Sequence, residues 1–222
     1  DRSRRSAILD EAHTLARADG RPDLVGNVLV AEYLSLWDPT TSDRRARIAV
    51  EVARAARATG DVDLTFFGGF FEAIGLAERC DVASARNVLE HLSAAADATH
   101  NFYFRFLVER FLLSLDILAG RGDAQAGVDA LAAEYGDTHA DTAGTWSIQT
   151  GGIAIQAGRL GALAPALAAM TEESSVGANW TGAYGLALAL AGDRDGAMAV
   201  LDRLDPPPLD YFWLVTTQCI AE

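Results

Sequence analysis

Two aromatic blocks are the segments of this sequence at which a ligand could bind. The first block is Phe66–Phe71, which contains a pair of glycines, and the second is Phe102–Phe106. Large rings beside glycines can line an apolar pocket, or a groove for a helical peptide, because glycine permits close approach. Aromatic residues at helical spacing more often pack as core residues between helices. A core is therefore the expected role of these rings, and a binding pocket is the alternative.

Four charged residues stand within or beside these apolar blocks, namely Glu72, Arg105, Glu109 and Arg110. They could hold the polar groups of a ligand, or they could pair with one another across adjacent helices. Burying an unpaired charge costs several kcal/mol or more. Pairing is therefore the expected arrangement.

The residue patterns that enzymes need are missing from the sequence. All 18 basic residues are arginine, so neither a P-loop lysine nor a Schiff-base lysine is available. The four histidines are scattered without metal-ligand spacing, and no serine has the flanking glycines of a nucleophile elbow. The pairs Asp61/Asp63 and Asp193/Asp195 lack the later ligands of a calcium loop, and we expect helix caps there. We predict no catalytic activity, no metal and no cofactor.

Charge and hydropathy exclude two further classes of partner. The formal net charge is −13, from 31 acidic and 18 basic residues, which would repel a nucleic-acid backbone. No apolar run reaches the roughly 18 residues that a membrane span requires. Cys80 and Cys219 lie in helical apolar patterns and are expected to be free and buried. We therefore predict a cytoplasmic protein that binds neither nucleic acid through this segment nor a membrane.

Helices must position all of these residues. Apolar residues recur at spacings of three and four throughout, and alternating β-branched runs are absent. Short turns divide the pattern, and most combine a glycine that closes one helix with an aspartate that opens the next. The predicted turns begin at Gly20, Trp37, Gly60, Cys80, Gly120, Gly136, Gly158, Gly192 and Asp205. These divisions predict about twelve helices of roughly 12–20 residues.

A repeat is visible in the second half of the sequence. Trp146 and Trp180 stand 34 residues apart, and Trp213 follows 33 residues later. Further matches at the first spacing are Gly151/Gly185, Ala157/Ala191, Gly158/Gly192 and Leu167/Leu201. A helical hairpin of this length cannot bury its apolar face alone and must stack on its neighbours. The prediction is an all-α, right-handed solenoid of antiparallel helix pairs, forming a single domain over residues 1–222.

The pattern resembles tetratricopeptide repeats, with a small residue in the first helix, glycine at the turn and alanine early in the second helix. The segment Trp180–Leu204 is the most similar to that family. Further segments resemble the helical-repeat region of large actinobacterial LuxR-type regulators, namely 31–39, 44–61 and 208–214. In those proteins an ATPase module is joined to such an array and to a DNA-binding or a nucleotide cyclase domain. The resemblance implies a sensor and protein-interaction segment within a longer multidomain protein.

The candidate binding residues are those of the aromatic blocks and of the inner surface that such an array presents. They are Phe67, Phe70, Ile74, Tyr103, Arg105, Arg110, Trp146, Ile148, Asn179 and Trp180. The expected partners are a neighbouring ATPase or DNA-binding module or a peptide, together with a small apolar effector, and a homodimer is a further expectation. The alternative is an all-α small-molecule-binding domain or helical enzyme with a closed apolar cavity.

Overall fold

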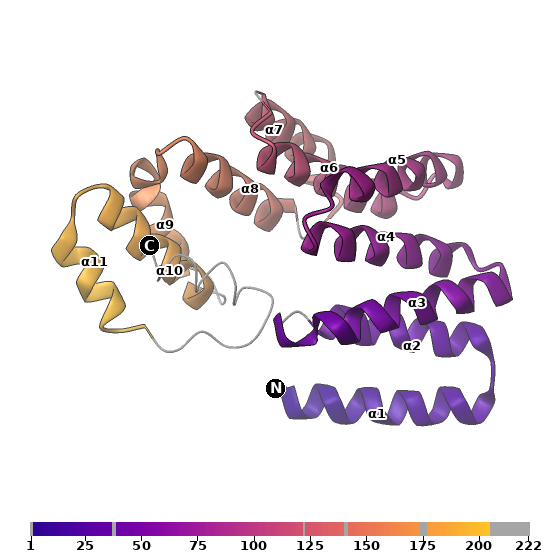
Figure 1. Ribbon diagram of the computed structural model, residues 1–222. Coiled ribbons are helices and arrows are strands. Elements are labelled where there is room, and N and C mark those ends of the chain that lie inside the picture. The colour runs from indigo at the N-terminus through magenta and orange to yellow at the C-terminus, as the bar shows by residue number, and fades with distance from the viewer. Residues whose placement is uncertain (1, 37–38, 122, 140–141, 174–176, 205–222) are drawn as a thin grey trace. The chain divides into compact units, whose positions relative to one another are not determined.

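The computed structural model describes residues 2–36, 39–121, 123–139, 142–173 and 177–204. Within these ranges the chain forms eleven α-helices and two 3-10 helices, and no strands (Figure 1). The predicted all-α class is confirmed. The helix expected after Asp205 lies outside the described residues.

The chain divides into two compact units, which we call unit 1 (Asp1–Asp116) and unit 2 (Ile117–Glu222). Each unit has its own buried apolar residues. The prediction of one continuous domain over 1–222 depends on how the units join, and it stays a prediction.

Unit 1 is a series of helices that run side by side and reverse direction at each turn (Figure 1). The successive pairs α1–α2, α2–α3, α3–α4 and α4–α5 pack together, and α2 also contacts α4. The elements are α1 (Arg2–Asp19), α2 (Pro22–Ser35), η1 (Pro39–Thr41), α3 (Ser42–Thr59), α4 (Val62–Glu78), α5 (Val82–Thr99) and α6 (Phe102–Leu118), whose last two residues belong to unit 2.

The turn between α3 and α4 has the predicted glycine–aspartate chemistry. Gly60 adopts a φ of 69°, a left-handed conformation that glycine enters without steric cost. The Asp61 carboxylate then accepts a hydrogen bond of 2.9 Å from the backbone N–H of Leu64. Asp193 caps α11 in the same way, accepting from the N–H of Gly196 at 2.9 Å. The capping interpretation of both aspartates is confirmed.

Two turns contain a non-glycine residue in the left-handed region. The prediction that Cys80 is buried is wrong, because it lies after the end of α4 with a φ of 62° and its side chain is exposed. Cys219 lies outside the described residues. The turn at His100, with a φ of 53°, was not predicted from the sequence. There the Asn101 side chain accepts a hydrogen bond of 3.1 Å from the N–H of Phe104 and so caps α6.

Helix α4 is the centre of unit 1, because two adjacent glycines bring different neighbours close to it. A Cβ at Gly68 would lie 3.3 Å from the Cα of Ala53 in α3, and a Cβ at Gly69 would lie 3.1 Å from a methyl group of Leu92 in α5. On α2, Gly26 makes room for the buried side chain of Leu64. These contacts explain why a segment with so many large rings also contains glycines.

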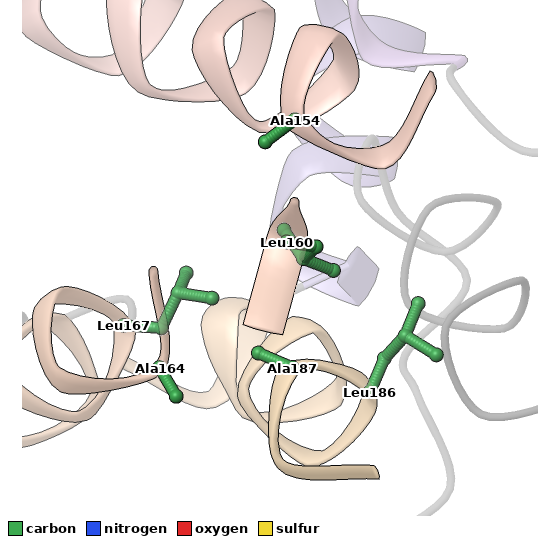
Figure 2. Packing of buried hydrophobic residues seen from close by; sticks show 6 residues of the cluster. All are labelled: Ala154, Leu160, Ala164, Leu167, Leu186 and Ala187. Carbon is green, nitrogen blue, oxygen red and sulfur yellow. The ribbon is translucent and has the colours of Figure 1, made fainter. Parts of the chain in front are cut away.

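Unit 2 contains a smaller core around a 3-10 turn. Its elements are α7 (Ala124–Tyr135), α8 (Thr142–Gln156), η2 (Leu160–Leu163), α9 (Ala164–Glu173), α10 (Gly177–Leu190) and α11 (Arg194–Leu201). Leu160 of η2, which is 2% exposed, lies between Ala154 of α8 and Ala187 of α10 (Figure 2). Leu167 and Leu186 complete the cluster from α9 and α10. The turn predicted at Gly158 is therefore followed by η2 before α9 begins.

Two glycines that the repeat pairs with each other have different surroundings. A Cβ at Gly185 in α10 would lie 3.2 Å from a methyl group of Val200, whereas nothing lies within 4 Å of a Cβ at Gly151 in α8. Gly185 thus packs closely against Val200 of α11, whereas Gly151 has no such neighbour.

We expect Gly151→Ala to raise the free energy of unfolding by about 0.5–1 kcal/mol, because alanine favours the helix and meets no neighbour. The free energy of unfolding of Gly185→Ala should be lower than that of Gly151→Ala by at least about 1 kcal/mol, because the added methyl group crowds Val200. Urea denaturation of both variants followed by circular dichroism measures the difference. Equal changes at the two positions would contradict the packing described for Val200.

Candidate functional site

The aromatic block of α4 forms the core that joins alternate helices of unit 1. Phe71 stacks on Tyr33 of α2 with ring centroids 3.6 Å apart. Phe66 stacks on Phe104 of α6 at 3.8 Å, with the rings 3° from parallel. These four side chains are buried. The structure therefore supports the core interpretation for most of the first aromatic block.

An apolar pocket of about 120 Å³ adjoins this core between α4, α5 and α6. Its buried lining residues are Phe66, Leu92, Ala96 and Phe104. Its exposed lining residues are Val62, Thr65, Ala95 and Thr99. The pocket thus opens near the amino-terminal end of α4, and no charged side chain lines it.

The six candidate residues of unit 1 fall into three groups by exposure. Phe70 and Ile74 are 6% and 8% exposed and pack as core residues, whereas Tyr103 is 44% exposed. Phe67 is half-buried, with its ring 5.7 Å from those of Phe71 and Phe104. The remaining two, Arg105 and Arg110, are half-buried on α6.

Two of the four embedded charges pair with each other, and a third lies over an aromatic ring. Arg105 contacts Asp97 of α5 at 3.1 Å and Glu109 of its own helix at 3.4 Å. The guanidinium of Arg110 lies 5.4 Å from the centre of the Phe106 ring, an arrangement that favours a cation–π interaction. Glu72 is exposed. Arg105 and Glu109 therefore pair with each other, but along one helix and not across adjacent helices as predicted.

A buried glutamate joins the first three helices. Glu32 of α2 is 5% exposed, and one of its carboxylate oxygens lies 2.6 Å from Nε2 of His13 in α1. The other oxygen accepts a hydrogen bond of 2.7 Å from Nε of Arg44 in α3. The side chain of Arg44 is partly exposed, but its charge compensates a buried carboxylate.

The neighbouring residue, Arg45, is the most buried charged side chain described in unit 1. It is 4% exposed, donates to the backbone carbonyl of Leu36 at 2.6 Å and to the Thr41 hydroxyl at 3.0 Å, and pairs with Glu78 of α4. These bonds connect α2, η1, α3 and α4. Sequence reasoning missed Arg45. Its spacing of three, four and seven residues before Ile48, Ala49 and Val52, which are buried, was the available signal.

Burial raises the pKa of the Tyr33 hydroxyl to about 12, and the nearby Glu78 carboxylate adds to the rise. An ordinary tyrosine has a pKa of about 10, so the folded protein holds this proton more tightly than the unfolded chain. The associated stability is present below pH about 10 and is lost as the pH rises from about 10 through about 12.

We expect Tyr33→Phe to remove this part of the alkaline destabilisation, because phenylalanine keeps the ring but has no proton to lose. Urea unfolding at a series of alkaline pH values measures the slope of stability against pH. Tyr103→Phe is the matched control, since Tyr103 is 44% exposed. Identical slopes for the wild type and Tyr33→Phe would contradict the raised pKa.

The four candidate residues of unit 2 lie on α8 and α10. Trp146 is 40% exposed, and its indole N–H donates to the Asp129 carboxylate of α7 at 2.8 Å. Ile148 is half-buried, and Trp180 packs against the apolar cluster shown in Figure 2. The side chain of Asn179 lies outside the described part of the structure. The ten candidates therefore divide between the two units, and a shared inner surface stays a prediction.

The fold and these side chains define an all-helical protein whose buried polar groups connect helices. Among the described residues, no group of three or more His, Cys, Asp or Glu side chains could hold a metal ion. None of the described helices has the length and apolar composition needed to cross a membrane. No protein-family model, curated protein or solved structure matches the chain.

Proposed function

We propose that this chain is a non-catalytic scaffold of stacked helical hairpins that binds another protein module. The observation that supports this most is the direct packing of alternate helices in unit 1. Tyr33 of α2 stacks on Phe71 of α4, and Phe66 of α4 stacks on Phe104 of α6, while α3 and α5 occur between these helices in the sequence. Packing of each helix on its neighbour and on the next but one is typical of hairpin arrays.

The resemblance to the helical-repeat region of LuxR-type regulators supports a signalling role for this scaffold. On this proposal the partner is a neighbouring ATPase or DNA-binding module, and a small apolar effector modulates the contact. Unit 2 has thirteen acidic residues against four arginines, which favours a basic partner surface such as that of a DNA-binding module. The remaining candidate partner in this proposal is a second copy of the chain, with which it would form a homodimer.

The alternative is a small-molecule domain or enzyme with a closed cavity, which would need a larger space than the apolar pocket of unit 1 provides. The apolar pocket of unit 1 has a volume of about 120 Å³. Pockets for drug-sized ligands usually measure about 300–1,000 Å³. The pocket is therefore too small to enclose a typical enzyme substrate.

The test is a binding measurement with purified ATPase and LuxR-type DNA-binding modules, read by hydrogen exchange and by calorimetry. We expect one module to bind and to slow exchange on α8, the helix that carries the exposed candidate Trp146. Trp146→Ala should weaken binding by at least about tenfold, as for an interface hot spot. Leu15→Ala is the control, since Leu15 is a 63% exposed apolar residue of α1. Absence of binding to either module would overturn the proposal.

A further inference from the structure

We propose that the pocket between α4, α5 and α6 is a binding site for one small, neutral, apolar molecule about the size of a single ring. This inference adds to the proposed function the chemical class of the effector. A regulatory role for the bound molecule rests on the proposed function. The pocket lies wholly within unit 1.

The size of the pocket limits the ligand. A dry engineered cavity of about 150 Å³ lined by apolar side chains binds benzene or xenon. The pocket measures about 120 Å³ and has an exposed side at Val62, which is 55% exposed. A single ring or a short branched alkyl chain fits this space with part of its surface toward the opening.

The polarity of the lining requires a neutral ligand. Only two lining side chains are polar, and the Thr65 hydroxyl already donates to the backbone carbonyl of Asp61 at 2.7 Å. The Thr99 hydroxyl donates to the carbonyl of Ala95 at 3.0 Å. No charged side chain lines the pocket, so an ionised ligand would lose hydration without gaining a partner.

Small residues on α5 maintain the space beside the rings. Ala95 and Ala96 face the same pocket as Phe66 and Phe104, whose rings are held rigidly by their stacking at 3.8 Å. A larger side chain at position 95 would occupy the space from the exposed side without changing the buried core. Alanine and leucine both favour a helix, so such a substitution should preserve α5.

The experiment titrates the protein with xenon and, separately, with benzene, and follows methyl signals by nuclear magnetic resonance. We expect saturable shifts at Val62 and Leu92, which both line the pocket. Ala95→Leu and Ala95→Phe should weaken benzene binding by at least about tenfold, because their side chains fill the site. Ala94→Leu and Ala94→Phe are the matched controls, since Ala94 is exposed on α5 and does not line the pocket.

Absence of saturable shifts with both probes, or equal affinity in the wild type and both Ala95 variants, would overturn the inference. Circular dichroism verifies that each variant keeps its helices. The two proposals fail separately. If benzene binds but no partner module binds, the scaffold proposal is refuted and the pocket proposal is supported. If a partner module binds but benzene and xenon do not, only the pocket proposal is refuted.

Discussion

Phe71→Ala is expected to lower the free energy of unfolding of unit 1 by about 4 kcal/mol, the usual cost of removing a buried phenylalanine side chain. Phe71 is 1% exposed and stacks on the equally buried Tyr33. The substitution therefore leaves a cavity between α2 and α4 and exposes one face of the Tyr33 ring to it.

Urea denaturation measures this loss, and hydrogen exchange by mass spectrometry assigns it to the helices of unit 1. Phe102→Ala is the matched control, because Phe102 begins α6 but is 63% exposed. We expect the control to change stability by less than about 0.5 kcal/mol. A similar small change for Phe71→Ala would show that α2 and α4 do not pack through these rings.

Arg45→Ala should cost about 3 kcal/mol, because it deletes several hydrogen bonds from a buried charged group at once. The carbonyl of Leu36 and the hydroxyl of Thr41 lose a donor, and Glu78 loses its ion pair. The side chain of Glu78 is 37% exposed, so water can solvate its carboxylate after the substitution. For this reason we expect a loss at the lower end of the range for broken buried pairs.

Thermal and urea unfolding of Arg45→Ala should be compared with Arg47→Ala, which removes an exposed arginine from the same helix. The control is expected to stay within about 0.5 kcal/mol of the wild type. Arg45→Met separates packing from charge, because methionine retains much of the side-chain volume without the donors. Equal stability of Arg45→Ala and Arg47→Ala would show that the Arg45 bonds contribute nothing to unit 1.

Local chemistry explains which parts of the fold could be predicted. The turns at Gly60 and Gly192 follow from the left-handed freedom of glycine and from the aspartate caps beside them. The turn at Cys80 is also predicted, because Asp81 follows it and caps α5. The turn at His100 is missed, because neither glycine nor aspartate stands beside it. Helical periodicity likewise predicts buried faces without telling which neighbouring helix covers each face.

The candidate site was harder to predict, because its charges depend on contacts between helices. Glu32 and Arg44 lie twelve positions apart, and no local pattern indicates that they meet. Arg45 has the spacing of a core position, but its residue type argues for solvent exposure. From the sequence alone, the rings of Phe66–Phe71 could form either a core or a pocket. In the structure most of these rings are buried in the core, and a small pocket lies beside them. Only the tertiary packing of α4, α5 and α6 distinguishes these roles.

Unit 1 holds its first helix far less firmly than its central one. Ala16 is the only buried residue among the side chains described in α1, whereas α4 buries seven residues, from Leu64 to Ile74. His13 of α1 contacts Glu32 of α2 at 2.6 Å. Local opening that frees α1 therefore requires less free energy than any opening that includes α4. Unit 1 thus has a graded stability, in which an outer helix can detach while the aromatic centre stays folded.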